Sequence, residues 1–198
     1  YSLYFSPYYG KYFEEDPVQA MMDRIRCKGA RKAGNANGRT IVRSAPDVIR
    51  GKRGMIAARR LKTLWDQGCD VRIAYTVMGR DVKKHLNGGG GRGPVPMKHL
   101  VQDFDGDGDF DNYFHLKVLT INGRIGADRT AYVTFNGSAN TSDPSSRPDE
   151  QIGKLVGKRN TLAYQRFIDR WFENPPPNAG RRADADPNID PYQHVDMD

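Results

Sequence analysis

A β-α-β alternation over residues 40–76 is the feature that most limits what this chain can fold into. Residues 40–44 and 70–76 have the composition of buried strands. The helical segment between them, residues 52–67, has an apolar face made of Ala57, Leu61, Leu64 and Trp65, with Gly68 following. Its basic residues are predicted to lie away from that face, and they are Arg53, Arg59, Arg60 and Lys62. The pattern predicts an α/β domain with a mixed, partly parallel sheet flanked by helices.

Further elements are predicted on both sides of this unit. They are strands at 1–6, 115–121, 131–137 and 150–156, and helices from Asp16 to about Arg26, at 80–86 and at 158–172. The glycine-rich residues 87–94 are expected to form a mobile active-site flap or a plain linker. Residues 1–172 then make one lobe, and residues 173–198 make a Pro-rich, acidic C-terminal tail.

The charge of the chain is strongly basic. Its 198 residues carry a net charge of +7, but the tail alone contributes −4, so residues 1–172 carry +11. A surface of that kind attracts lipid head groups, nucleic acid or other phosphates, and it favours no one of them. No segment has the apolar length of a membrane-spanning helix.

Four polar residues in two short segments suggest a phosphate site. His115 and Lys117 are two apart on one predicted strand, as Ser138 and Asn140 are on the next, so each pair is predicted to share a face. An ammonium, an amide and a hydroxyl together suit the non-bridging oxygens of a phosphodiester. An imidazole beside them can attack phosphorus or transfer a proton near neutral pH.

Taken together, His-Leu-Lys at 115–117, Gly-Ser-Ala-Asn at 137–140 and the downstream Asp149-Glu150 resemble the HKD motif of the phospholipase D superfamily. The resemblance covers residues 1 to about 172 and looks closest to the C-terminal half of secreted, actinobacterial-type members. It implies that His115 is a catalytic histidine, that Lys117 and Asn140 bind phosphate, that Ser138 supports the site and that Glu150 orients a histidine.

Two departures from the family pattern matter. The family's Asp, five residues after the Lys, is here Asn122, and a hairpin-like segment over 122–128 is inserted. Members build one active site from two such motifs, whereas this sequence contains one. The second motif then comes either from a second copy of the chain, as a homodimer, or from a missing N-terminal half. We favour the missing half, because the chain starts at Tyr1 directly with an apolar run.

The resemblance implies phosphodiester hydrolysis or transfer, with phospholipid head-group cleavage through a phosphohistidine as the expected reaction. In a C-terminal half His115 would be the general acid, and in a homodimer two copies of His115 would fill both roles. A nuclease of the same superfamily is the rival interpretation. A non-catalytic phosphate- or lipid-binding lobe is the third, since Asn122 and the single motif are what a decayed half-site would show.

An acidic segment directly before His115 is predicted to bind calcium in a structural role. Its carboxylates and a glycine match the opening of a calcium loop, although position 12 is Phe114 instead of Glu. Without a cation these carboxylates would repel one another and a phosphodiester; the alternative is a solvated acidic turn. The chemistry itself requires no cofactor. The predicted ligands are Asp103, Asp105, Asp107, Asp109 and Asp111.

The two cysteines, Cys27 and Cys69, stand at the ends of predicted elements, where a disulfide can close without disturbing a strand ladder. A disulfide predicts a secreted, extracellular protein; two reduced cysteines in the cytosol are the alternative. An aromatic cluster near the N-terminus is expected to pack over a neighbouring element or to make peripheral contact with a membrane, and it consists of Tyr8, Tyr9, Tyr12 and Phe13.

Overall fold

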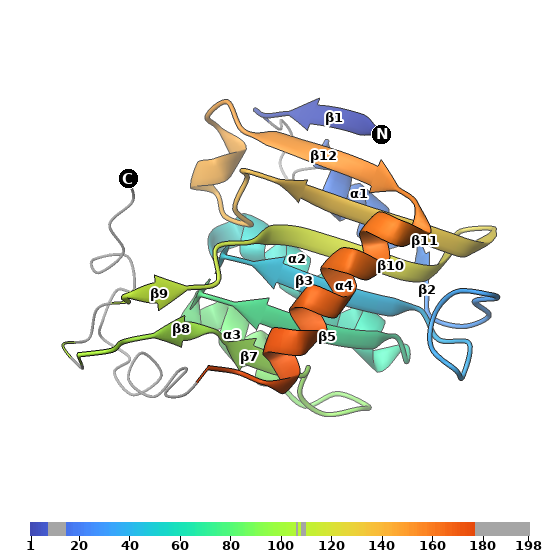
Figure 1. Cartoon of the computed structure of the whole chain (residues 1–198), viewed down its shortest axis with the longest axis horizontal. Coiled ribbons are helices and arrows are strands. Elements are labelled where there is room, and N and C mark those ends of the chain that lie inside the picture. The colour runs from blue at the N-terminus through green and yellow to red at the C-terminus, as the bar shows by residue number, and fades with distance from the viewer. Residues whose placement is uncertain (8–14, 106, 108–109, 177–198) are drawn as a thin grey trace.

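A mixed sheet of eight strands runs through the middle of the molecule (Figure 1), in the order β1-β12-β11-β10-β3-β5-β7 with β2 beside β10. The computed structural model describes residues 1–7, 15–105, 107 and 110–176. Only β3, β5 and β7 are mutually parallel, and the remaining pairs are antiparallel. The strands are β1 Ser2–Phe5, β2 Ile25–Arg26, β3 Ile41–Pro46, β5 Asp70–Tyr75, β7 Met97–His99, β10 Lys117–Ile125, β11 Asp128–Gly137 and β12 Gln151–Val156.

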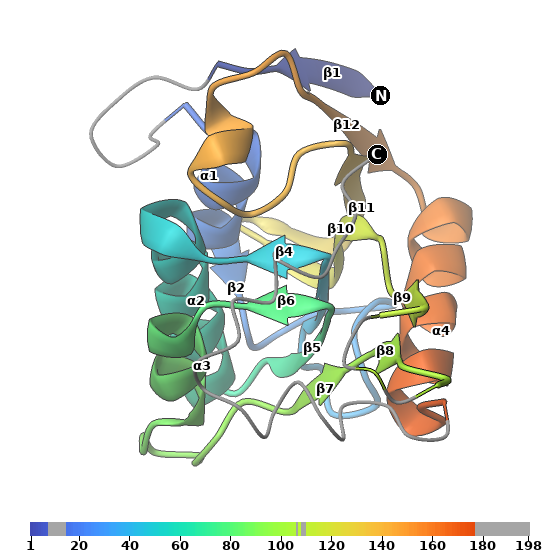
Figure 2. The same cartoon turned by 90° about the vertical axis from the view of Figure 1, so that its left-hand side faces the viewer.

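Helices cover both faces of this sheet (Figure 2). On one face lie α1 (Pro17–Arg24), α2 (Gly51–Asp66) and α3 (Arg80–Asn87), and on the other lies α4 (Lys158–Glu173). The predicted α/β class and mixed sheet flanked by helices are therefore confirmed. Among the described helices none is both long and apolar enough to cross a bilayer.

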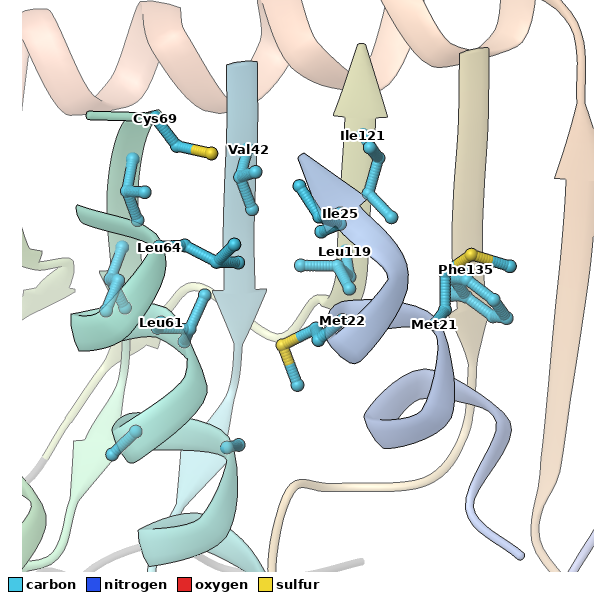
Figure 3. Close-up of a cluster of buried hydrophobic side chains, with 14 of the residues drawn as sticks. Met21, Met22, Ile25, Val42, Leu61, Leu64, Cys69, Leu119, Ile121 and Phe135 are labelled. Atoms are coloured by element: carbon cyan, nitrogen blue, oxygen red, sulfur yellow. The ribbon is translucent and has the colours of Figure 1, made fainter. Parts of the chain in front are cut away.

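The main core lies between the sheet and the helices α1 and α2 (Figure 3). Phe135 and Leu119 on the strands meet Met22 of α1 and Leu61 of α2, and all four are buried. A second, smaller core lies under α4, around Ala45, Ala74, Leu100, Val118 and Ile168. Both faces of the central strands are thus buried, which explains why residues 41–46 form an uninterrupted buried run.

The prediction for the basic residues of α2 is wrong at two positions. Arg53 and Lys62 are buried, with 2% and 7% of their surface exposed. Arg53 pairs with the fully buried Asp16 at 2.7 Å, and Lys62 pairs with Asp66 at 2.8 Å. Helical periodicity predicts which side a residue is on, but a long cationic side chain is buried where a carboxylate neutralises it.

A disulfide joins Cys27 to Cys69, as predicted, across 42 residues. It fixes the start of the loop 28–39 to the end of α2. The helix ends there because Gly68 has φ +93°, a backbone conformation in which glycine carries no steric penalty.

Short pairs and loops complete the fold. β4 (Val48–Ile49) pairs with β6 (Val77–Met78), and β8 (Val101–Gln102) pairs with β9 (Asn112–Tyr113). The glycine-rich segment 88–93 lies against the C-terminal end of α2, where the Gly93 carbonyl accepts from Trp65 Nε1 at 3.1 Å. That end of the sheet is opposite to His115 and Lys117. Of the two alternatives predicted for residues 87–94, the active-site flap is therefore wrong and the plain linker remains.

Candidate active site

His115 and Lys117 meet at one carboxylate, that of Asp47. His115 Nε2 lies 3.3 Å and Lys117 Nζ lies 3.1 Å from Asp47 Oδ2. Lys117 begins β10, while His115 precedes the strand by two residues and is held edge-on against the Tyr113 ring, with 5.2 Å between ring centroids. The imidazole is 62% exposed, whereas the Lys117 side chain is 11% exposed.

Asp47 is the site residue that sequence reasoning missed. It follows β3 directly, is 5% exposed and is fixed through its backbone: its N–H donates to Leu116 O at 2.5 Å, and its carbonyl accepts from Thr76 and Val77 at 3.1 and 2.8 Å. The available signal was a single acid immediately after a buried strand. Because β3 turned out to pair with β10, that acid lies beside the motif.

Ser138 and Asn140 lie in the loop after β11, which ends at Gly137, and the prediction that both stand on the strand is wrong. A side chain at 137 is excluded, because a Cβ there would lie 2.0 Å from the Gln151 carbonyl oxygen. Ser138 is exposed, and its Oγ accepts from the Gln151 N–H at 3.1 Å. The close approach of β12 therefore ends the strand and sends the chain back toward α2.

The loop that carries Asn140 is held by the N-terminal end of α2. Arg53 Nη1 donates to the Asn140 carbonyl, and Thr141 N–H donates to Val48 O at 2.9 Å. Asp143 accepts from the backbone N–H groups of Lys52 and Arg53, at 3.0 and 2.6 Å. These bonds satisfy free amides at the start of α2, so helix and loop position each other.

The Asn140 side chain has an oxygen without a hydrogen-bond partner in the described part of the chain. Its Oδ1 is buried, and the amide makes no hydrogen bond to any residue that the structure describes. Ala139 and Thr141 on either side of it line the same cavity as Lys117, Pro46 and Arg53. An imidazole, an ammonium and a carboxylate thus meet, and the loop of Asn140 borders the same cavity as the ammonium of Lys117.

Asn122, at the position where the resemblance to the HKD motif expects Asp, does not lie with these residues. It is five residues beyond Lys117 along β10, roughly 17 Å away at the rise of a strand. Its side chain is buried, accepting from Gly34 N–H at 2.8 Å and donating to Gln165 Oε1 at 3.0 Å. The carboxylate that supports His115 and Lys117 within this chain is Asp47, so the replacement at 122 leaves that support in place.

Glu150 stands just before β12, and its backbone N–H donates to Ser6 Oγ at 2.8 Å. In the described part of the chain, the carboxylate within 4.0 Å of His115 is that of Asp47. Orientation of a histidine by Glu150 therefore stays a prediction, and a histidine of a second lobe is where it would apply.

The acidic segment brings three of the predicted calcium ligands together. Oxygen atoms of Asp103, Asp105 and Asp111 all lie within 4.8 Å of one another, in the connection between β8 and β9. Asp107 N–H donates to Asp105 Oδ1 at 3.2 Å, and Phe104 N–H donates to Asp111 Oδ2 at 2.5 Å. Calcium binding here stays a prediction, since three carboxylates supply only part of the about six to eight oxygen ligands that calcium takes. Asp109 lies outside the described residues, as do the aromatic cluster (Tyr8, Tyr9, Tyr12 and Phe13) and residues 177–198 of the tail.

Among the comparisons with known proteins, the solved structures show which fold this chain has. Neither the family models nor the curated proteins match this sequence. Among solved structures, NucT from Helicobacter pylori has a TM-score of 0.57 and 18% identity, covering 87% of this chain and 94% of its own. Nuc from Salmonella typhimurium, a phospholipase D family member, has a TM-score of 0.51 and 12% identity, covering 88% of this chain and 96% of its own. The chain therefore has the fold of a phospholipase D family lobe.

A third similar structure shows the same lobe inside a larger protein. Polyphosphate kinase from Porphyromonas gingivalis has a TM-score of 0.53 and 11% identity, covering 87% of this chain but 22% of its own. One lobe of this fold thus occurs both as nearly an entire chain and as part of a longer one.

Proposed function

We propose that this chain supplies one half-site of a phosphodiesterase of the phospholipase D type. The observation that carries the proposal is the convergence of His115 and Lys117 on the buried Asp47, while the residues on either side of Asn140 line the same cavity as Lys117. A cation and an amide donor together suit the non-bridging oxygens of a phosphodiester. An imidazole fixed at one nitrogen by a carboxylate is the arrangement of an activated nucleophile or general acid.

The geometry gives the two nitrogens of His115 different roles. Nε2 lies 3.3 Å from Asp47 Oδ2, at ion-pair distance, and the tautomer that suits attack carries its proton on Nε2 and its lone pair on Nδ1. Nδ1 makes no hydrogen bond to a described residue, and the ring is largely exposed. Attack by Nδ1 forms the P–N bond while the P–O bond to the leaving alcohol breaks, and Asp47 stabilises the positive charge that develops on the ring.

The second histidine comes from another lobe, either a second copy or another half of a longer protein. It donates its proton to the leaving alkoxide, then takes a proton from water, which attacks phosphorus and releases His115. In the reverse assignment His115 is the general acid. Lys117 and Asn140 hold the phosphoryl oxygens in both steps, so the residues described require no metal for the chemistry.

Two substrates fit this reaction. A phospholipid is the substrate that the sequence resemblance favours, with secretion and lipid degradation as its biological setting. A nucleic acid is favoured by the cations Lys28, Arg39 and Arg92, which line a polar groove at the other end of the sheet. Incubation with phosphatidylcholine vesicles and a primary alcohol separates the two, because a phosphohistidine intermediate transfers the phosphatidyl group to the alcohol. Formation of phosphatidyl alcohol supports the phospholipid, and DNA cleavage with intact vesicles supports the nuclease.

The catalytic assignment is tested with His115→Ala and Lys117→Ala in the complete assembly, using a chromogenic phosphodiester. We expect turnover to fall by at least about 10³-fold for each, with the free energy of unfolding changed by less than about 1 kcal/mol for the exposed His115. The control is His85→Ala, on α3 and away from the site. Turnover that survives both site changes would refute the assignment.

A further inference from the structure

A polar groove lies at the end of the sheet opposite to His115 and Lys117. Its walls are the 28–39 loop, the end of α2, the start of β5 and the glycine-rich segment. Figure 1 shows the 28–39 loop and the turn between β10 and β11 at one end of the sheet, with β8 and β9 at the other. Along β10 the two ends are roughly 26 Å apart. The groove is therefore separate from the catalytic half-site.

The acids that line this groove are neutralised from outside it. Both oxygens of Asp66 accept from Lys62 Nζ at 2.8 Å, and Asp70 Oδ1 accepts from Arg43 Nη1 at 2.9 Å. Neither Lys62 nor Arg43 lines the groove. The carboxylates of Asp66 and Asp70 thus form no ion pair with a cation that lines the groove.

Three cations of the groove have no carboxylate within 4.0 Å among the described residues, and they are Lys28, Arg39 and Arg92. Arg72, the fourth, is paired with Asp169 and Glu173. Arg92 is nevertheless fixed in place: Nη1 donates to the Trp65 and Cys69 carbonyls at 2.7 and 2.9 Å, and its guanidinium lies 3.7 Å over the Trp65 ring. Because neutral carbonyl groups and an aromatic ring hold Arg92 in place, no carboxylate neutralises its positive charge, which can act on a ligand.

Arg39 is the strongest sign of a missing anion. Its Nη1 is buried and has no hydrogen-bond partner in the described part of the chain. The guanidinium packs over Gly68, where a Cβ would lie 2.9 Å from Nη1. A buried charged donor without an acceptor is costly, and a phosphate oxygen would supply that acceptor.

More positive charge adjoins the groove at Gly29. Arg129 Nε donates to Gly29 O at 2.5 Å, and Arg124 Nε donates to Gly126 O at 3.0 Å, so both guanidiniums are anchored by backbone oxygens. Desolvation, followed by the charges of Arg31 and Arg124, lowers the pKa of Arg129. The charges of Arg124 and Arg129 extend the positive field from the groove onto the hairpin that joins β10 and β11.

We propose that this groove binds the phosphodiester backbone of a nucleic-acid strand. Cations that line a concave, polar surface can each contact one of the successive phosphates of a nucleic-acid strand. A bilayer fits less well, because none of the large apolar side chains exposed on the described surface lines the groove. The proposal goes beyond the proposed reaction, since binding at this end of the sheet needs no turnover at His115.

The test compares two triple variants with the same net charge, in a His115→Ala background that prevents cleavage. The groove variant is Lys28→Gln/Arg39→Gln/Arg92→Gln, and the control is Arg59→Gln/Lys84→Gln/Arg159→Gln, which removes three exposed cations elsewhere. Binding of a fluorescein-labelled twenty-nucleotide oligothymidylate is followed by anisotropy from 50 to 300 mM NaCl. The loss of three phosphate contacts should make the negative slope of log K against log [NaCl] shallower by about 2. At 0.1 M NaCl this corresponds to a loss of up to about 100-fold in affinity. The control should stay within about threefold of the parent.

Several results would overturn the proposal. Equal losses in both triple variants would mean diffuse attraction to a basic protein. Loss of binding to phosphatidylserine vesicles in the groove variant, with oligonucleotide binding unchanged, would mean a membrane site. If the triple variant has a reduced Tm, the double variant Lys28→Gln/Arg92→Gln is used instead, because it changes only exposed side chains. It should make the negative slope shallower by about 1.4. An unchanged slope in that folded double variant refutes the groove.

Discussion

The buried ion pair between Asp16 and Arg53 gives the sharpest test of how the site is held. Arg53 Nη2 and Nε lie 2.7 and 2.8 Å from Asp16 Oδ2, and the two side chains are 3% and 0% exposed. Asp16 also caps α1, accepting from Val18 N–H at 2.9 Å. Arg53 reaches the Asn140 carbonyl as well, so one side chain connects α1, α2 and the loop that carries Asn140. The perturbation is Arg53→Met, which keeps the aliphatic volume and removes the charge.

The expected loss is large because Asp16 would remain as a buried carboxylate without its cation. Removing one partner of such a pair costs about 3–5 kcal/mol. The chain offers a matched control in Arg60, which also joins α2 to α1, through Asp23 at 2.6 Å. Asp23 is 56% exposed, so Arg60→Met should cost less than about 1 kcal/mol.

Urea unfolding of both variants with the disulfide intact measures the difference in their free energies of unfolding, provided that their m-values are equal. For a chain of this length the Arg53 change should lower Tm by about 6–20 °C and the Arg60 change by at most about 4 °C. Adding Asp16→Asn, which keeps an N-cap residue, should restore part of the loss by removing the unpaired charge. Equal effects of Arg53→Met and Arg60→Met would refute the argument from burial.

Two further predictions concern the acidic segment and the disulfide. Calcium at about a hundredfold excess over its dissociation constant should add roughly 2.7 kcal/mol to the free energy of unfolding, measured as a higher Tm by calorimetry. The double variant Asp103→Asn/Asp105→Asn should abolish this shift. If calcium leaves the Tm of metal-stripped protein unchanged, the segment is only a solvated acidic turn. Replacing Cys27 and Cys69 by Ser should cost at most about 4 kcal/mol, measured by urea unfolding against the parent under oxidising conditions, and no loss would contradict a bond that limits the unfolded chain.

The sequence alone determined the class of the fold and its four helices and longer strands, but not the short strands β2, β4, β6, β7, β8 and β9. Helical periodicity over 52–67 and the flanking apolar runs predict α2 between β3 and β5, and Asp16-Pro17 predicts the start of α1, because these signals are local. The pairing of Cys27 with Cys69 was predictable for a similar reason, since the chain offers only these two cysteines.

Only the tertiary structure decided which charges meet. Asp47 is 68 residues from His115 in sequence and reaches it because β3 and β10 are neighbours in the sheet. Arg53 is buried because Asp16 is there to neutralise it, and Asn122 is remote from the site because β10 is extended. Hydrophobic periodicity records burial along one element, whereas the partner of a buried charge depends on strand order and helix packing, which no local pattern carries.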